Sequence, residues 1–138
     1  MPKHLIALFV LLAGSAFGNE SSPPAAPNDI RTVEKSEHFL RGLTGFAGHL
    51  SAAELSFERL LRTSDAEAIF LQIANSTHAT GAAKVYAACG LSQLSSGRLP
   101  EIVRLLRREV SYVSTMNGDV LTQKRMSEFI DQISRYGC

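Results

Sequence analysis

The chain has 138 residues, of which 45% are hydrophobic and 20% are charged, and its formal net charge is +1. These values are typical of a globular protein, because the chain is too apolar for intrinsic disorder and too short for two ordinary domains. A nearly neutral chain also lacks the strongly basic character of a dedicated nucleic-acid-binding protein.

Residues 1–18 have the features of a secretory signal peptide. A basic start at Lys3 precedes an unbroken apolar run over residues 5–12, and small residues follow up to Gly18. This pattern predicts cleavage after Gly18, and the apolar run is too short to span a hydrocarbon core of about 30 Å. Ser15 stands where a bacterial lipoprotein has its lipid-accepting cysteine. We therefore expect an exported protein, periplasmic or secreted, that is soluble after signal cleavage and has no stable membrane anchor.

The next segment, residues 19–29, contains three of the five prolines among small and polar residues. Such a composition predicts a disordered linker because it offers nothing to bury. The expected organisation is therefore a signal peptide, this linker, and a single helical domain over residues 30–138.

Apolar residues recur at helical spacing through most of that domain. A first helix is expected from Ile30 to a stop at Gly42. Ser64 and Glu67 have the spacing of a capping box and predict the start of a later helix. The other apolar stripes that predict helices lie at Leu50–Leu61, Ala66–Ile73, Ala82–Leu94, Leu99–Leu106 and Met126–Ile133.

The pattern changes between residues 110 and 124. Two β-branched segments flank Asn117-Gly118, which is the strongest short signal for a β-hairpin. Two strands alone are marginally stable in water, so we expect the hairpin to lie against helices. The predicted fold is mainly α, with five to six helices and one β-hairpin near residues 110–124.

The segment Ala82–Leu91 is rich in alanine and ends on a Cys-Gly-Leu step. It resembles the inner helix of a HEAT-type repeat, with Asp65–Asn75 as its outer partner, and this resemblance implies a small helical-hairpin stack. The pattern Tyr86-x-x-Cys-Gly-Leu, followed by a Met-x-Gly hairpin, also resembles small exported bacterial proteins of unknown function. In those proteins a second cysteine follows the hairpin glycine, where this chain has Asp119.

Cys89 and Cys138 are the only cysteines. An oxidising compartment favours their pairing, and closing a loop of about 50 residues would stabilise the domain by roughly 4 kcal/mol. Free, buried or intermolecular thiols are the alternatives that remain open. Neither cysteine has a second cysteine or a histidine nearby at metal-ligand spacing.

No catalytic motif of the common hydrolase, zinc-protease or nucleotide-binding kinds is present, so we expect no enzyme activity, cofactor or metal. The alternative is a small hydrolase or metal-dependent enzyme that uses helix-borne glutamate and histidine residues. Glu34 and His38 are four residues apart on the first expected helix, and so are Glu54 and Glu58 on the second. We expect this second pair to be exposed and ionised at an ordinary pKa, since Glu58 and Arg62 have the favourable spacing for an ion pair.

Four arginines form the most informative group of charges: Arg98, Arg104, Arg107 and Arg108. After signal cleavage the part before Ala68 has eight acidic and five basic residues, and the part after it has five and eight. An arginine cluster suits recognition of carboxylates or phosphates, but no aromatic residues interleave with it as nucleic-acid stacking would require. The alternative interpretation is a hydrated helix face whose arginines pair with Glu101 and Glu109. The leading hypothesis is an exported, non-catalytic module that binds another protein, one with an acidic surface, through these arginines.

Overall fold

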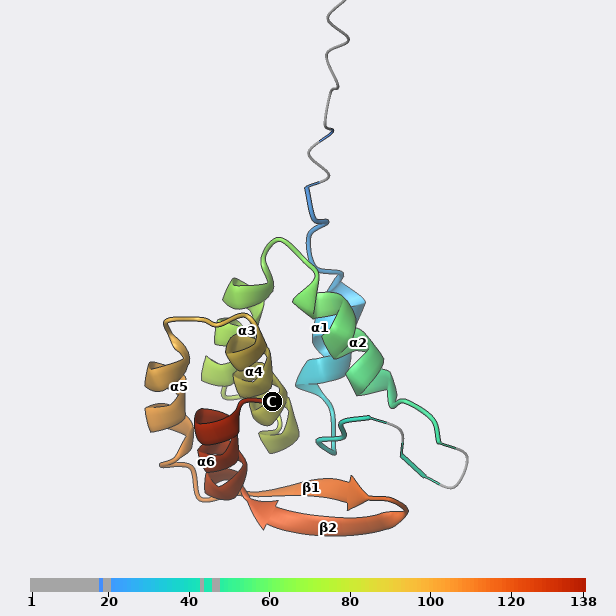
Figure 1. Cartoon of the computed structure of the whole chain (residues 1–138), viewed down its shortest axis with the longest axis vertical. Helices are drawn as coiled ribbons and strands as arrows, with labels where there is room; N and C mark the ends of the chain where they lie inside the picture. Colours follow the sequence, from blue (N-terminus) through green and yellow to red (C-terminus); the bar gives the residue numbers. More distant parts are fainter. Residues whose placement is uncertain (1–17, 19–20, 43, 46–47) are drawn as a thin grey trace, which may run out of the picture.

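The computed structural model describes residues 18, 21–42, 44–45 and 48–138, so the predicted signal peptide lies outside the described residues except for Gly18. The described residues form six helices and one two-stranded antiparallel hairpin (Figure 1). A mainly α fold with one hairpin is therefore confirmed. The elements are α1 Pro27–Glu34, α2 Ala52–Leu61, α3 Ala66–Asn75, α4 Gly81–Gln93, α5 Leu99–Leu106, β1 Tyr112–Asn117, β2 Val120–Arg125 and α6 Met126–Tyr136.

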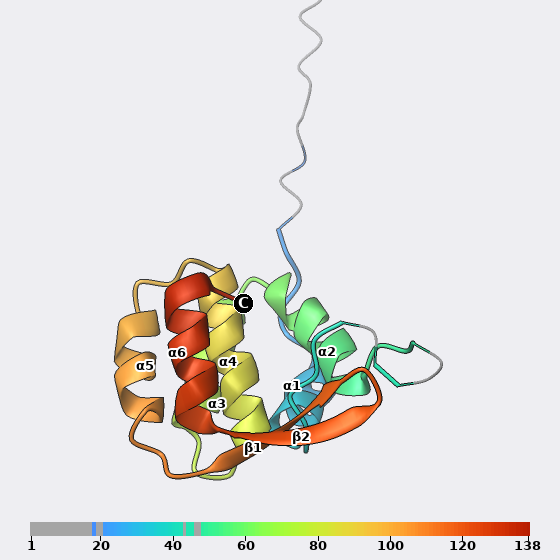
Figure 2. The same cartoon turned by 60° about the horizontal axis from the view of Figure 1, so that its bottom comes forward.

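Helix α4 is the centre of the molecule and contacts α1, α2, α3, α5 and α6. A helix surrounded in this way must be apolar on all sides, and α4 is buried almost all round. Figure 2 shows α4, α6 and α5 side by side. The buried residues of α4 are Ala82, Ala83, Val85, Tyr86, Ala87, Ala88, Cys89, Gly90 and Leu91.

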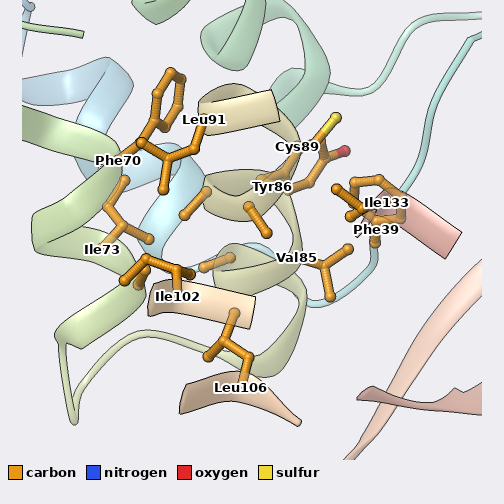
Figure 3. Close-up of a cluster of buried hydrophobic side chains, with 14 of the residues drawn as sticks. Phe39, Phe70, Ile73, Val85, Tyr86, Cys89, Leu91, Ile102, Leu106 and Ile133 are labelled. Atoms are coloured by element: carbon orange, nitrogen blue, oxygen red, sulfur yellow. The ribbon is translucent and has the colours of Figure 1, made fainter. Parts of the chain in front are cut away.

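The closest approach in the core lies between α3 and α4, the two helices expected to form a pair. A Cβ atom added at Gly90 would lie 2.5 Å from Cε2 of the fully buried Phe70. The absence of a side chain at Gly90 therefore lets the Phe70 ring rest directly on the backbone of α4. Figure 3 shows Phe70 and Ile73 of α3 with Leu91 of α4 and Ile102 of α5 in one buried cluster.

The hairpin lies against α4 and α6, as expected of two strands that need a supporting surface. Asn117 pairs with Val120, so the turn consists of Gly118 and Asp119. Gly118 has a φ of +66°, a value that the first turn residue of a type II′ hairpin requires and that glycine adopts without strain. Val113 of β1 is buried, whereas all of β2 is exposed.

The predicted boundary between linker and domain is wrong. Helix α1 begins at Pro27, inside the expected linker, because a proline in the first helical turn loses no backbone hydrogen bond. The chain before it is also held: the Ala25 amide donates to Oδ1 of Asp65 at 2.9 Å, and the Ser64 amide donates to the Pro23 carbonyl. The packed domain therefore reaches back to at least Pro23.

The predicted end of the first helix at Gly42 is also wrong, because α1 stops at Glu34. The following chain turns away to meet the hairpin, where the Phe39 amide donates to the Ser114 carbonyl at 2.8 Å. Tyr86 holds the same segment through its hydroxyl group, which accepts from the Leu40 amide and donates to the Leu40 carbonyl. These tertiary hydrogen bonds replace the helical ones that the periodicity predicted.

The predicted capping box does not form. Helix α3 begins at Ala66, and the preceding Asp65 makes no side-chain cap hydrogen bond. Its carboxylate instead accepts from Ala25, and the Glu67 carboxylate accepts from the Ser96 hydroxyl. Both carboxylates therefore have partners from distant parts of the chain.

Cys89 and Cys138 form the expected disulfide, with their Cα atoms 5.2 Å apart. The bond ties the middle of α4 to the chain that follows α6. None of the helices in the described part of the chain combines the length and apolar character needed to cross a bilayer.

Candidate functional site

The four arginines expected to bind a partner differ in their surroundings. Arg98 precedes α5 and donates from Nε to Oε2 of Glu101 at 3.0 Å, a hydrogen bond that lowers the pKa of the Glu101 carboxyl. Arg107 donates to Oδ1 of Asp131 on α6 at 2.6 Å. Arg104 and Arg108 are exposed and form no ion pair with any residue that the structure describes.

The expected hydrated-face pairing forms only for Arg98. Glu101 pairs with Arg98 instead of Arg104 or Arg108. Glu109 pairs with Lys84 of α4, where its Oε1 lies 2.5 Å from Nζ. Because α5 ends at Leu106, Glu109 is beyond the helix and its direction is set by the chain leading to β1.

Two hollows that share Arg107 extend the predicted cluster. One, of about 370 Å³, lies between α5 and α6, and its lining includes Arg104 and Ser134. The other, of about 300 Å³, lies where the α5–β1 connection meets the start of α6, and its lining includes Tyr112, Arg125 and Ser127. The second hollow is also lined by Glu109, which pairs with Lys84. We define the arginine surface as the hollow-lining residues Arg104, Arg107, Val110, Tyr112 and Arg125 together with the neighbouring exposed Arg108.

Sequence reasoning missed Arg125 and Tyr112. The two residues are direct partners across the hairpin, at the end far from the turn. The hairpin prediction contained the necessary signal, since counting outward in both directions from Asn117-Gly118 makes Tyr112 and Arg125 partners at the end far from the turn. Arg125 forms no ion pair among the described residues, and the structure places it beside Arg107 in one hollow.

The arginine surface also carries apolar groups that the fold leaves uncovered. Val110 is fully exposed, and Tyr112 is 62% exposed. Single exposed apolar residues are ordinary, but an aromatic and an aliphatic side chain beside several arginines have the composition of a protein interface.

The carboxylates considered for catalysis have an environment that the sequence did not predict. Glu54 is buried rather than exposed, and its Oε1 lies 3.0 Å from Nη1 of Arg41. The same nitrogen lies 3.0 Å from Oε1 of Glu58, so Glu58 pairs with Arg41 and not with Arg62. Burial raises the pKa of the Glu54 carboxyl, against the opposing effect of Arg41 and of the Gly42 amide that donates to Oε2. The expectation of an ordinary pKa is wrong because Arg41 and the buried setting come from a different segment.

A second carboxylate shows the opposite shift. Asp29 of α1 accepts hydrogen bonds from Nη2 of Arg59 at 2.7 Å and from the Ser56 hydroxyl at 3.0 Å. The Arg59 hydrogen bond is the main reason why the pKa of Asp29 is lowered. This ion pair joins α1 to α2, so the guanidinium group of Arg59 already has a carboxylate partner within the domain.

The predicted helical spacing of Glu34 and His38 is lost, because α1 ends at Glu34 and His38 lies in extended chain paired with Ser114. Within the described residues, no cluster of three or more histidine, cysteine, aspartate or glutamate side chains is placed to hold a metal ion. An enzymatic role for any of these residues stays a prediction.

No protein-family model matches the chain, and no curated protein matches it either.

Proposed function

We propose that this protein is an exported, non-catalytic binding module and that a partner protein docks on the arginine surface. One observation carries the proposal. Arg125 lines one hollow together with the exposed Val110 and Tyr112, and Arg104 lines the other. Arg108 is exposed just beyond the end of α5, and none of these three arginines forms an ion pair among the described residues. Arginine and tyrosine are enriched among the residues that dominate binding energy in protein interfaces.

The chemistry of the surface indicates a partner with exposed carboxylates. The guanidinium group presents donors in a fixed fork that matches a carboxylate, and it loses less hydration energy than an ammonium when an interface covers it. Arg98 and Arg107 already have carboxylate partners, so a docking protein gains most from the other arginines. The positive excess after Ala68 would also speed the approach of an acidic protein.

Export agrees with two further observations. The signal-like sequence over residues 1–18 predicts passage across a membrane, and the Cys89–Cys138 disulfide is of a kind that persists in oxidising compartments. A domain of this size with a disulfide suits a periplasmic or secreted location.

The proposal is tested by photo-crosslinking at the surface itself. A benzoylphenylalanine introduced at Tyr112 should capture the partner from the exported fraction of the source cells, and mass spectrometry should identify it. The affinity of the purified partner is then measured by calorimetry for the wild type and for Arg104→Glu/Arg108→Glu/Arg125→Glu. Because three attractive charges become repulsive, we expect binding at least about 100-fold weaker, with a strong dependence on salt.

A matched control reverses three other exposed cations that form no ion pair among the described residues: Arg31→Glu/Lys35→Glu/Arg62→Glu. This variant has the same net charge as the first one, so it should retain affinity within a few-fold if the arginine surface is the docking site. Equal loss in both variants would mean that only net charge matters. Unchanged affinity in the first variant would exclude docking at the arginine surface.

A further inference from the structure

A groove on another part of the molecule carries a second inference. It has a volume of about 500 Å³ and lies between the hairpin, the extended chain at residues 39–41, and the last turns of α6. Figures 1 and 2 show the hairpin crossing one end of the helical body, beyond α6. We call it the hairpin groove, and its lining includes Phe39, Arg41, Thr122, Lys124, Phe129 and Gln132.

The lining combines an apolar floor with neutral hydrogen-bonding groups. Phe39, Phe129 and Ile133 are core residues that reach the floor. The uncharged polar residues of the lining are threonines and carboxamides, among them Gln123 and Gln132. Carboxamides donate and accept hydrogen bonds as peptide groups do, so this lining suits a peptide backbone with apolar side chains below it.

The charged side chains that line the groove are two cations, Arg41 and Lys124. None of its lining residues is an aspartate or a glutamate. Arg41 is offset by Glu54 and Glu58, whereas Lys124 forms no ion pair among the described residues. The Lys124 ammonium lies 5.9 Å from the centre of the Phe129 ring, at the groove floor. A ligand with a carboxylate near Lys124 would complete the lining.

The walls of the groove are fixed before any ligand binds. The Tyr86 hydroxyl donates to the Leu40 carbonyl at 2.6 Å and accepts from its amide at 3.0 Å, which holds the wall at residues 39–41. The Phe39 ring packs edge-on against Tyr86 at 4.8 Å and against Phe129 at 5.6 Å. The disulfide holds Cys138 at the opposite wall. A preformed site of this kind loses little conformational entropy on binding.

The edge of β2 favours an extended ligand. Hydrogen-bonded pairs alternate along an antiparallel hairpin, starting from Asn117 and Val120 at the turn, so Leu121 and Gln123 direct their backbone groups away from β1. No strand lies beside this edge in the described part of the chain. Gln123 and Lys124 also line the groove, so a strand added along β2 would place alternate side chains over it.

We infer that the hairpin groove binds an extended, acidic peptide segment of a partner protein. The inference rests on the proposed binding function, but it uses a surface distinct from the arginine surface, so either site can fail alone.

The experiment uses the mature, disulfide-bonded protein as the target of a random dodecapeptide library displayed on phage. We expect the enriched peptides to contain aspartate or glutamate alternating with β-branched residues. The strongest peptide is then synthesised and titrated into ¹⁵N-labelled protein. Shifts should concentrate at the amides of β2, Phe39 and Gln132. Failure to enrich any peptide, or shifts confined to other surfaces, would overturn the inference.

Two variants locate the site without disturbing the core, since both residues are exposed. Lys124→Glu should weaken the peptide by about tenfold or more, because a charge-assisted contact becomes repulsive. Thr122→Phe should abolish binding by filling the groove while preserving the thermal transition. Lys35→Glu reverses the same type of charge outside the groove and should change the affinity less than about twofold, the range typical of distant surface charges. Peptide affinity that survives both groove variants would overturn the inference.

Loss of peptide binding in the groove variants, with unchanged capture of the partner at Tyr112, would show that the two sites are independent. The reverse is tested with Arg104→Glu/Arg108→Glu, which leaves β2 unchanged and should keep full affinity for the peptide. If that variant loses the peptide as strongly as Lys124→Glu does, the ligand recognises positive charge in general and the groove inference fails.

Discussion

The disulfide offers the sharpest test of how this small domain is stabilised. Cys138 is exposed and Cys89 is fully buried, so Cys138→Ser removes the cross-link while leaving the core packing in place. The two cysteines are 49 residues apart, and closing a loop of that length in the unfolded chain corresponds to about 4 kcal/mol of stabilisation. For a domain of this size the melting temperature should fall by about 15 °C.

The measurement is urea unfolding followed by circular dichroism, on the oxidised wild type, the reduced wild type and Cys138→Ser. Reduction and substitution remove the same constraint, so both losses should agree within about 1 kcal/mol. Cys89→Ala should be less stable than Cys138→Ser by roughly another 1 kcal/mol, because it also leaves a cavity in α4. A loss below about 1 kcal/mol for Cys138→Ser would refute the loop-entropy reasoning.

Three further predictions concern packing and pH. Gly90→Ala should destabilise the domain by about 1–2 kcal/mol, because the clash with the buried Phe70 ring outweighs the gain in helix propensity. Calorimetry should show that Gly90→Ala destabilises the domain less when Phe70→Leu is also present, because the smaller side chain relieves the clash. Burial raises the pKa of Glu54, so the contribution of this carboxyl to stability is complete below its unfolded pKa of 4.5 and declines as pH rises through the folded value. Urea unfolding should therefore show that the stability of the wild type relative to Glu54→Gln increases as pH falls. Arg59 lowers the pKa of Asp29, so the stabilisation by the ionised Asp29 is present above pH 3.8 and disappears as pH falls through the folded value. Asp29→Asn should therefore lose less stability than the wild type on acidification below pH 4.

Sequence periodicity predicted most of the elements because their signals are local. The apolar stripes of α2 to α6 repeat within a few residues, and most of their residues are buried, although Leu50 and Leu94 at the ends of two stripes are exposed. The hairpin followed from Asn117-Gly118 between β-branched runs, although the turn itself is at Gly118 and Asp119. The cysteine pairing followed from the expected compartment and the presence of only two cysteines.

Polar residues were predicted less well, because several of them have partners far along the chain. Glu67 accepts from the Ser96 hydroxyl instead of completing a capping box with Ser64, and Glu54 is buried against Arg41 instead of facing water. In each case a local motif competes with a tertiary partner, and the side chain binds the tertiary partner. On the arginine surface, Arg107 likewise forms its ion pair with a residue far along the chain, Asp131 of α6.

The amino-acid order alone determined the type and approximate position of nearly every element, and the presence of an arginine cluster on and around α5. Only the tertiary structure decided where the first helix begins and ends, which arginines keep their charge unpaired, and that a groove lies between the hairpin and α6. The physical reason is the range of the interactions. Helical and strand periodicity arise between residues two to four apart, whereas ion pairing and hollows depend on which distant segments the core brings together.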